Sequence, residues 1–163
     1  MPIGRFGQIL HLVPISAAVD HTTNTFNTSL VDMSKAHRAT LGVIFGAITA
    51  ASTTLPKLTL LASTVGTTVG AEAIAFKYRI SAAVGTDTQG AITDATSAGI
   101  DITASYDNML LLIDVDPALV AGKTDGRWVY LHITSAATIS ALATAAFAEI
   151  EPRYIAASPT SVS

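Results

Sequence analysis

The sequence AIAFKYRIS, at Ala73–Ser81, alternates strictly between two kinds of side chain. Large apolar side chains share one face and two basic side chains share the other: Ile74, Phe76, Tyr78 and Ile80 against Lys77 and Arg79. A period of two over this length is typical of a β-strand with one face in a core. The segment therefore predicts a half-buried strand whose basic face is solvated or meets an acidic partner.

Segments on both sides of this one also predict strands. They are Arg5–Val13, Asn24–Val31, His37–Ile48, Lys57–Ser63, Gly99–Ala104, Asn108–Val115 and Arg127–Thr134. Pro14 is expected to end the first of them, and the continuous apolar run NMLLLIDV predicts a strand that is buried on both faces. Short strands separated by turn signals predict an all-β sandwich or barrel.

Three local features refine this pattern. Gly42 and Gly46, inside a predicted strand, indicate a bulge or a close backbone approach. Asp116–Ala121, DPALVA, predicts one short helix, since Asp suits the N-cap and Pro the first helical position. Ser140–Ile150, SALATAAFAEI, is ambiguous, because its Ala content favours a helix whereas its alternation also fits a strand. The residues alone leave both conformations open there.

Length and composition indicate one domain with a protein-facing surface. The chain has 163 residues, of which 50% are hydrophobic and only 13% are charged. We expect a single domain over residues 1–163, with an N-terminal arm at 1–7 and a C-terminal tail at 156–163. Because charged residues are depleted in buried interfaces, this composition suits a surface that touches other protein.

Charge and residue usage exclude several classes of protein. The net charge is −3, so the sequence supplies no basic surface for nucleic acid. The chain has no cysteine, which excludes disulfides and zinc–thiolate sites. Despite a mean hydropathy of +0.50, its apolar runs are too short to predict a membrane span. The N-terminal sequence also makes a poor signal peptide.

Motifs for catalysis or cofactor binding are absent from the sequence. No two of the histidines His11, His21, His37 and His132 are spaced as a helical metal pair, and there is no GxSxG motif. The acidic residues Asp114, Asp116 and Asp125 could bind a hard cation, but they lack the EF-hand pattern and are better interpreted as a polar strand end. We therefore predict no catalytic residue, no cofactor and no metal.

The C-terminal stretch AEIEPRYIAASP resembles the ending of a family of small virion proteins of tailed bacteriophages, the head decoration or cement proteins. Members tend to end in an apolar strand and a Glu-Pro-Arg-Tyr motif, which here is Glu151, Pro152, Arg153 and Tyr154. The order of LGVIFGAI, KLTLLAS, FKYRI and RWVYLHIT along the chain also matches. The chain departs from the family at Ala136–Ala148, where relatives often carry larger apolar residues.

The resemblance implies an antiparallel β-sandwich of jelly-roll type with at most one short helix, and it favours a strand at Ser140–Ile150. It implies a virion protein, not an enzyme, that lies on the outer capsid surface and stabilises contacts between subunits of the phage major capsid protein. A homotrimer is the first expectation for its self-association and a dimer the second, with no nucleic acid and no membrane as partners. The candidate contact residues are Arg5, Phe6, Arg153 and Tyr154.

Two other functions remain open at this stage. A virion spike or fibre domain that binds a host-surface receptor or glycan would need Trp128 and Tyr130 exposed in a concave patch. A small β-fold hydrolase would need a histidine, a nucleophile and an acid to converge in one pocket.

Overall fold

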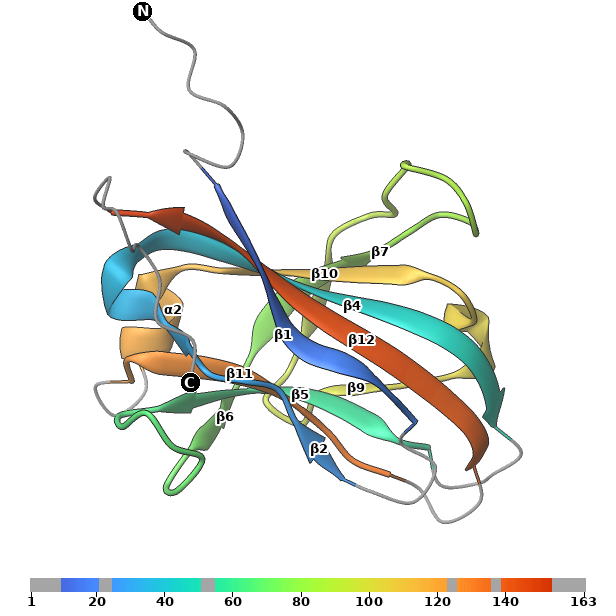
Figure 1. Ribbon diagram of the computed structural model, residues 1–163, viewed down its shortest axis with the longest axis horizontal. Helices are drawn as coiled ribbons and strands as arrows, with labels where there is room; N and C mark the ends of the chain where they lie inside the picture. Colours follow the sequence, from blue (N-terminus) through green and yellow to red (C-terminus); the bar gives the residue numbers. More distant parts are fainter. Residues whose placement is uncertain (1–9, 21–24, 51–54, 123–125, 136–138, 154–163) are drawn as a thin grey trace, which may run out of the picture.

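The structure is a computed structural model that describes residues 10–20, 25–50, 55–122, 126–135 and 139–153. They form two antiparallel sheets that lie as two layers (Figure 1). Sheet A has the order β1 (His11–Asp20), β12 (Ile139–Pro152), β4 (Ala36–Ala50), β10 (Leu110–Val115), β7 (Phe76–Ile80) and β8 (Thr93–Ala95). Sheet B has the order β2 (Phe26–Asn27), β11 (Trp128–Ile133), β5 (Lys57–Ser63) and β6 (Glu72–Ile74), with β3 (Val31–Asp32) against β11 and β9 (Ile100–Asp101) against β5.

The connectivity is that of a jelly roll. Along the chain, the strands cross repeatedly from one sheet to the other, so that the first and last strands, β1 and β12, become neighbours in sheet A. Sheet A then continues through β4 to β10, while β2, β11, β5 and β6 form the opposite layer. This is the arrangement of two Greek keys rolled into a sandwich. The predicted fold class, an antiparallel β-sandwich of jelly-roll type, is therefore confirmed.

The core lies between the two sheets and is built by alternation. On β4, Leu41, Val43 and Phe45 are buried, and on β5 the buried side chains include Leu58 and Leu60. All of these belong to one hydrophobic cluster, to which β10, β11 and β12 also contribute. Since a strand turns every second side chain to one face, each sheet supplies one apolar face to this cluster.

The ambiguous segment Ser140–Ile150 is a strand. It lies within β12, which pairs with β1 on one side and β4 on the other. Its buried side chains are every second residue: Leu142, Thr144, Ala146, Ala148 and Ile150. The tertiary pairing on both edges outweighs the helix propensity of alanine, which is a weak local preference.

The two glycines of β4 have the roles that their position predicts. A Cβ at Gly42 would lie 2.1 Å from the Cζ atom of Phe147, so the glycine makes room for that aromatic ring on the neighbouring strand. Gly46 lies where the register between β4 and β12 shifts, and a Cβ there would lie 3.1 Å from the Cβ of Ala143. Gly42 therefore allows the Phe147 ring to approach the backbone of β4 closely, and Gly46 lies at a bulge.

The strand predicted at Ala73–Ser81 is divided between the two sheets, which corrects the prediction. Residues Glu72–Ile74 form β6 and pair with β5 in sheet B, whereas Phe76–Ile80 form β7 and pair with β10 in sheet A. Only Ala75 lies between the two strands. A chain that switches sheets in this way makes a corner of the sandwich.

Other predicted strand bounds are corrected too. Pro14 does not end the first strand but pairs with Phe147 inside β1, an edge strand, where a missing backbone N–H is tolerated. Asn24–Val31 yields only the two-residue β2 and the first residue of β3. The strand β10 is not buried on both faces, because Asp114 is exposed and Leu112 only half-buried. The short strand β8 was not predicted at all.

The predicted short helix is confirmed as α2 (Pro117–Ala121). The Asp116 side chain accepts a hydrogen bond from the backbone N–H of Ala118 at 2.7 Å and so caps the helix. Two single-turn 3-10 helices, η1 (Met33–Lys35) and η2 (Ala104–Tyr106), are also present. No helix within the described ranges has the length and apolar character needed to cross a membrane.

Replacing Gly99 by Ala tests the turn that leads into β9. Gly99 has a φ of +78°, and a Cβ there would lie 2.3 Å from the carbonyl oxygen of Leu58. We expect Gly99→Ala to lower the free energy of unfolding by about 2–3 kcal/mol, because the backbone is strained and the new methyl group meets main chain of β5. Urea unfolding followed by Trp128 fluorescence measures the loss.

The matched control is Gly70→Ala. Gly70 has a similar φ of +69°, but nothing lies within 4 Å of a Cβ there. We therefore expect Gly70→Ala to lower the free energy of unfolding by about 1–2 kcal/mol, from the strained backbone conformation alone. Equal losses in the two variants would show that the contact with Leu58 contributes nothing.

Candidate interaction site

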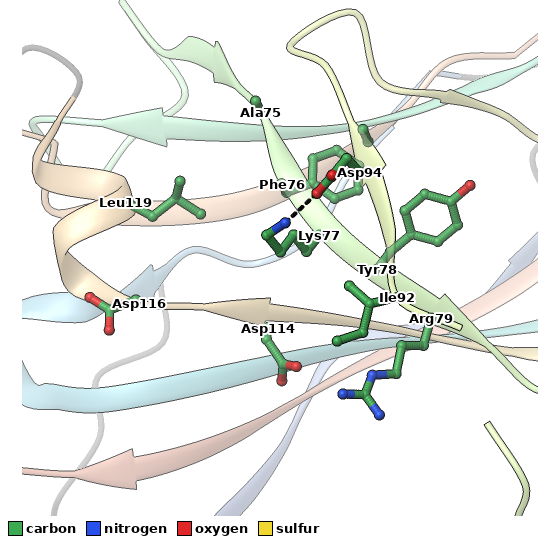
Figure 2. Close-up of a pocket in the computed structure, with 11 residues that line it drawn as sticks. Ala75, Phe76, Lys77, Tyr78, Arg79, Ile92, Asp94, Asp114, Asp116 and Leu119 are labelled. Atoms are coloured by element: carbon green, nitrogen blue, oxygen red, sulfur yellow. Dashed lines mark hydrogen bonds and ion pairs between the residues drawn. The ribbon is translucent and has the colours of Figure 1, made fainter. Parts of the chain in front are cut away.

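A cavity of about 500 Å³ opens where β7, β8 and the end of β10 approach α2 (Figure 2). Its lining combines apolar and charged side chains: Ala75, Phe76, Lys77, Tyr78, Arg79, Ile92, Asp94, Ala95, Asp114, Asp116 and Leu119. The volume lies within the usual range for small-molecule sites, about 300–1,000 Å³. Reactive side chains, if the chain has any, are therefore expected at this cavity.

The acidic side chains at this cavity have structural partners. Asp114 accepts a hydrogen bond from the Thr40 hydroxyl at 2.9 Å, and Asp116 caps α2. Asp94 forms an ion pair with Lys77 on the adjacent strand. Within the described ranges, no three His, Asp or Glu side chains are grouped so that they could hold a metal ion, and Asp125 lies outside those ranges.

A bidentate ion pair links Arg127, just before β11, to Asp32 at the end of β3. The guanidinium of Arg127 donates from Nε and Nη2 to the two carboxylate oxygens of Asp32, at 2.8 and 2.6 Å. The Ser34 hydroxyl and backbone N–H also donate to Asp32, at 2.7 and 3.0 Å. Burial by itself raises the pKa of Asp32, but these hydrogen bonds outweigh it and lower the pKa from 3.8 to about 2.

Arg153, one of the predicted contact residues, helps to fasten the end of β12. Its backbone N–H donates to the Lys35 carbonyl oxygen at 2.9 Å, and its Nε donates to the Ala36 carbonyl oxygen at 2.9 Å. Arg153 also lines a second cavity of about 220 Å³ together with Arg127. Arg153 as a whole is exposed.

The other three predicted contact residues, Arg5, Phe6 and Tyr154, lie outside the described residues. The structure nevertheless fixes where their segments join the body. His11 at the start of β1 pairs with Ile150 near the end of β12, and Pro152 pairs with Ala36. The segments that carry the predicted contact residues therefore join the body at the same end of sheet A.

Three of the histidines are described, and they lie on different strands. His11 is on β1, His37 on β4 and His132 on β11. The Nδ1 atom of His132 lies 2.5 Å from Oδ1 of its cross-strand partner Asn27, and burial lowers the pKa of His132. His21 lies outside the described residues. The structure thus gives His132 a packing role between β11 and β2.

The aromatic residues of β11 do not form an exposed platform. Tyr130 is only 3% exposed, and burial raises its pKa. Trp128 is half-buried, and the guanidinium carbon of Arg127 lies 5.4 Å from its ring centre. A glycan-binding patch needs open aromatic faces on which a sugar can stack. This pair of residues does not provide them.

No family model and no curated protein matches the chain. Among solved structures, a chain in the structure of infectious bursal disease virus, Gt strain, matches with 14% sequence identity and a TM-score of 0.23. The match covers 94% of this chain and 43% of that chain, so this chain spans less than half of the viral one. A TM-score this low does not establish a shared fold.

The Asp32 ion pair predicts a loss of stability in acid. The pKa of Asp32 is lowered on folding, so its contribution is complete above the ordinary value of 3.8 and is lost as the pH falls through about 2. The shift corresponds to about 2 kcal/mol. We expect the difference in free energy of unfolding between wild type and Asp32→Asn to shrink by this amount between about pH 6 and pH 2.

Urea unfolding at a series of pH values measures this difference. Asp94→Asn is the matched control, because it also removes a carboxylate from an ion pair but at an exposed position. That variant should keep the acid sensitivity of the wild type. A gap between wild type and Asp32→Asn that stays constant with pH would contradict the role given to Asp32.

Proposed function

We propose that this chain is a virion structural protein without enzymatic activity, which binds the outer surface of a phage capsid and stabilises contacts between subunits of the major capsid protein. The proposal starts from the family resemblance of the Glu-Pro-Arg-Tyr ending. The jelly-roll body supports it as a rigid frame on which binding segments can be carried. A fold of this kind hosts many functions, so the argument has to come from the surfaces.

The observation that carries the proposal is the common origin of the two terminal segments. β1 and β12 are neighbours and antiparallel, so the start of one strand lies beside the end of the other. Arg153 is fixed there by two hydrogen bonds to the backbone of Lys35 and Ala36. Contact residues on both segments can therefore act together on one site of a shell.

The physical mechanism is multivalent tethering. Two segments that leave one rigid body can hold neighbouring capsid subunits at a fixed separation. Each contact can be modest, because linked contacts raise the effective concentration of one another. Many copies on a shell then resist its expansion. The first expectation for self-association is a homotrimer placed at a threefold point of the shell, with a dimer as the second.

Removing the protein from particles tests the proposal. We expect heads that lack it to release their DNA at a lower temperature and under milder osmotic shock than complete heads, and purified protein added back should restore the difference. Release of DNA measured by fluorescence of an intercalating dye gives the result. Heads that resist heat and osmotic shock equally well without the protein would contradict the proposal.

Substitution of the contact residues tests the mechanism. We expect the double variant Arg5→Ala, Phe6→Ala and the single variant Arg153→Ala each to bind bare heads at least about tenfold more weakly, because arginine and aromatic side chains dominate interfaces. Co-sedimentation with heads measures the affinity.

Arg38→Ala is the matched control, since Arg38 is an exposed arginine of β4 whose ion pair with Glu151 is 3.8 Å long and solvated. It should bind heads as the wild type does. Equal affinity for all of the variants would place the contact elsewhere on the molecule.

A further inference from the structure

The second cavity, of about 220 Å³, is formed by η1, by α2 and by the residues that precede β11 and follow β12. Because η1 contacts both α2 and β11, these elements form one packed end of the molecule. The volume is below the usual range for small-molecule sites, about 300–1,000 Å³, so it suits a single functional group. The lining joins two cations to small or apolar side chains: Met33, Ser34, Pro117, Ala121, Arg127 and Arg153.

The two arginines of this cavity differ in their charge partners. Arg127 is paired with Asp32, which is 3% exposed and is not part of the lining. Arg153 forms no ion pair with any carboxylate of the described residues. The acids next to the lining in sequence have other roles, since Glu151 pairs with an arginine of β4 and Asp116 caps α2. The positive charge of Arg153 therefore lacks a counter-charge in the described part of the chain.

Both guanidinium groups are held in place and still have N–H groups to donate. Arg127 uses Nε and Nη2 for Asp32, and its Nη1 has no partner among the described residues. Arg153 donates from Nε to the Ala36 carbonyl oxygen at 2.9 Å, and its two Nη groups have no partner there either. Groups that are fixed before a ligand arrives lose little conformational entropy on binding. The cavity is thus preorganised for a hydrogen-bond acceptor with negative charge.

We propose that this cavity binds one carboxylate group, supplied by an Asp or Glu side chain of a protein partner. The planar guanidinium fork matches a carboxylate in shape, and charge-assisted bonds of this kind are among the strongest in proteins. One carboxylate carries the single negative charge that balances Arg153. A phosphate, with about −1.5 to −2 charge at pH 7, would exceed that balance. The apolar side chains of Met33, Pro117 and Ala121 can cover the methylene groups of the acidic side chain.

That the partner is a capsid subunit rests on the proposed function, whereas the carboxylate site can be tested on the purified chain alone. The probe is N-acetylglutamate methylamide, which has one carboxylate, and its neutral counterpart is N-acetylglutamine methylamide. In a titration followed by amide NMR, the first probe should give saturable shifts at Ser34, Gly126 and Arg153. The neutral probe should bind at least about tenfold more weakly, because it brings no charge to the guanidinium groups. Methyl phosphate should also bind more weakly than the carboxylate.

Substitutions assign the binding to this cavity. Arg153→Gln should raise the dissociation constant of the carboxylate probe at least about tenfold. Arg38→Gln is the matched control, because Arg38 is an exposed arginine outside the lining, and it should bind the probe as the wild type does. Ala121→Glu places a carboxylate at the cavity from the chain itself and should block the probe more strongly than Ala121→Gln, a change of the same size without charge. The amide spectrum of each variant reports its folding.

Three results would overturn the carboxylate site. They are the absence of saturable shifts at the lining residues, tighter binding of methyl phosphate than of the carboxylate probe, and equal dissociation constants for Arg153→Gln and Arg38→Gln. Binding to bare heads separates this site from the proposed function. A chain that binds the probe but not heads keeps the site and contradicts the capsid role, whereas a chain that binds heads but not the probe does the reverse.

Discussion

The pairing of β12 with both β1 and β4 is the contact on which the rest of the molecule depends. It places the last described strand between β1 and β4, and so joins β1 to the rest of sheet A. Without it, β1 would have no partner in sheet A, and the core would lose Leu142, Ala148 and Ile150. The pairing joins residues that are about 90 to 140 positions apart in the sequence. Contacts of such range are costly in loop entropy, so they form late and depend on the packing they complete.

Because its side chains are small, β12 fits between β1 and β4 in a tightly packed sheet. Alanines alternate on its two faces, and the single large aromatic residue, Phe147, lies over the glycine of β4 that leaves room for it. The outer face of sheet A carries apolar side chains such as Ile44 and Leu110 on its central strands, together with charged ones such as Arg38 and Asp114. A surface of this composition suits protein contact better than solvent, which gives the low charge content of the chain a structural meaning.

The acidic side chains that are candidates for chemistry are engaged in hydrogen bonds that stabilise the fold. Asp116 caps α2, Asp114 accepts a hydrogen bond from Thr40, and Asp32 binds Arg127 and Ser34. What distinguishes the protein is the placement of its surfaces: a common end of sheet A from which both terminal segments leave, and an outer face that carries apolar and charged side chains. The common end of sheet A supports the proposed attachment to a larger assembly.

The sequence alone determined the β class, the short capped helix and most strand positions, since alternation and capping are local properties of neighbouring residues. It also singled out Gly42 and Gly46, because glycine inside a strand needs a spatial reason. Only the tertiary structure decided that Ser140–Ile150 is a strand, that the chain changes sheets at Ala75, and that Arg127 and Arg153 line one cavity. These features depend on which distant strands pair and in what register. Strand partners and register are decided by packing across the whole sandwich, so no pattern within a short stretch of residues predicts them.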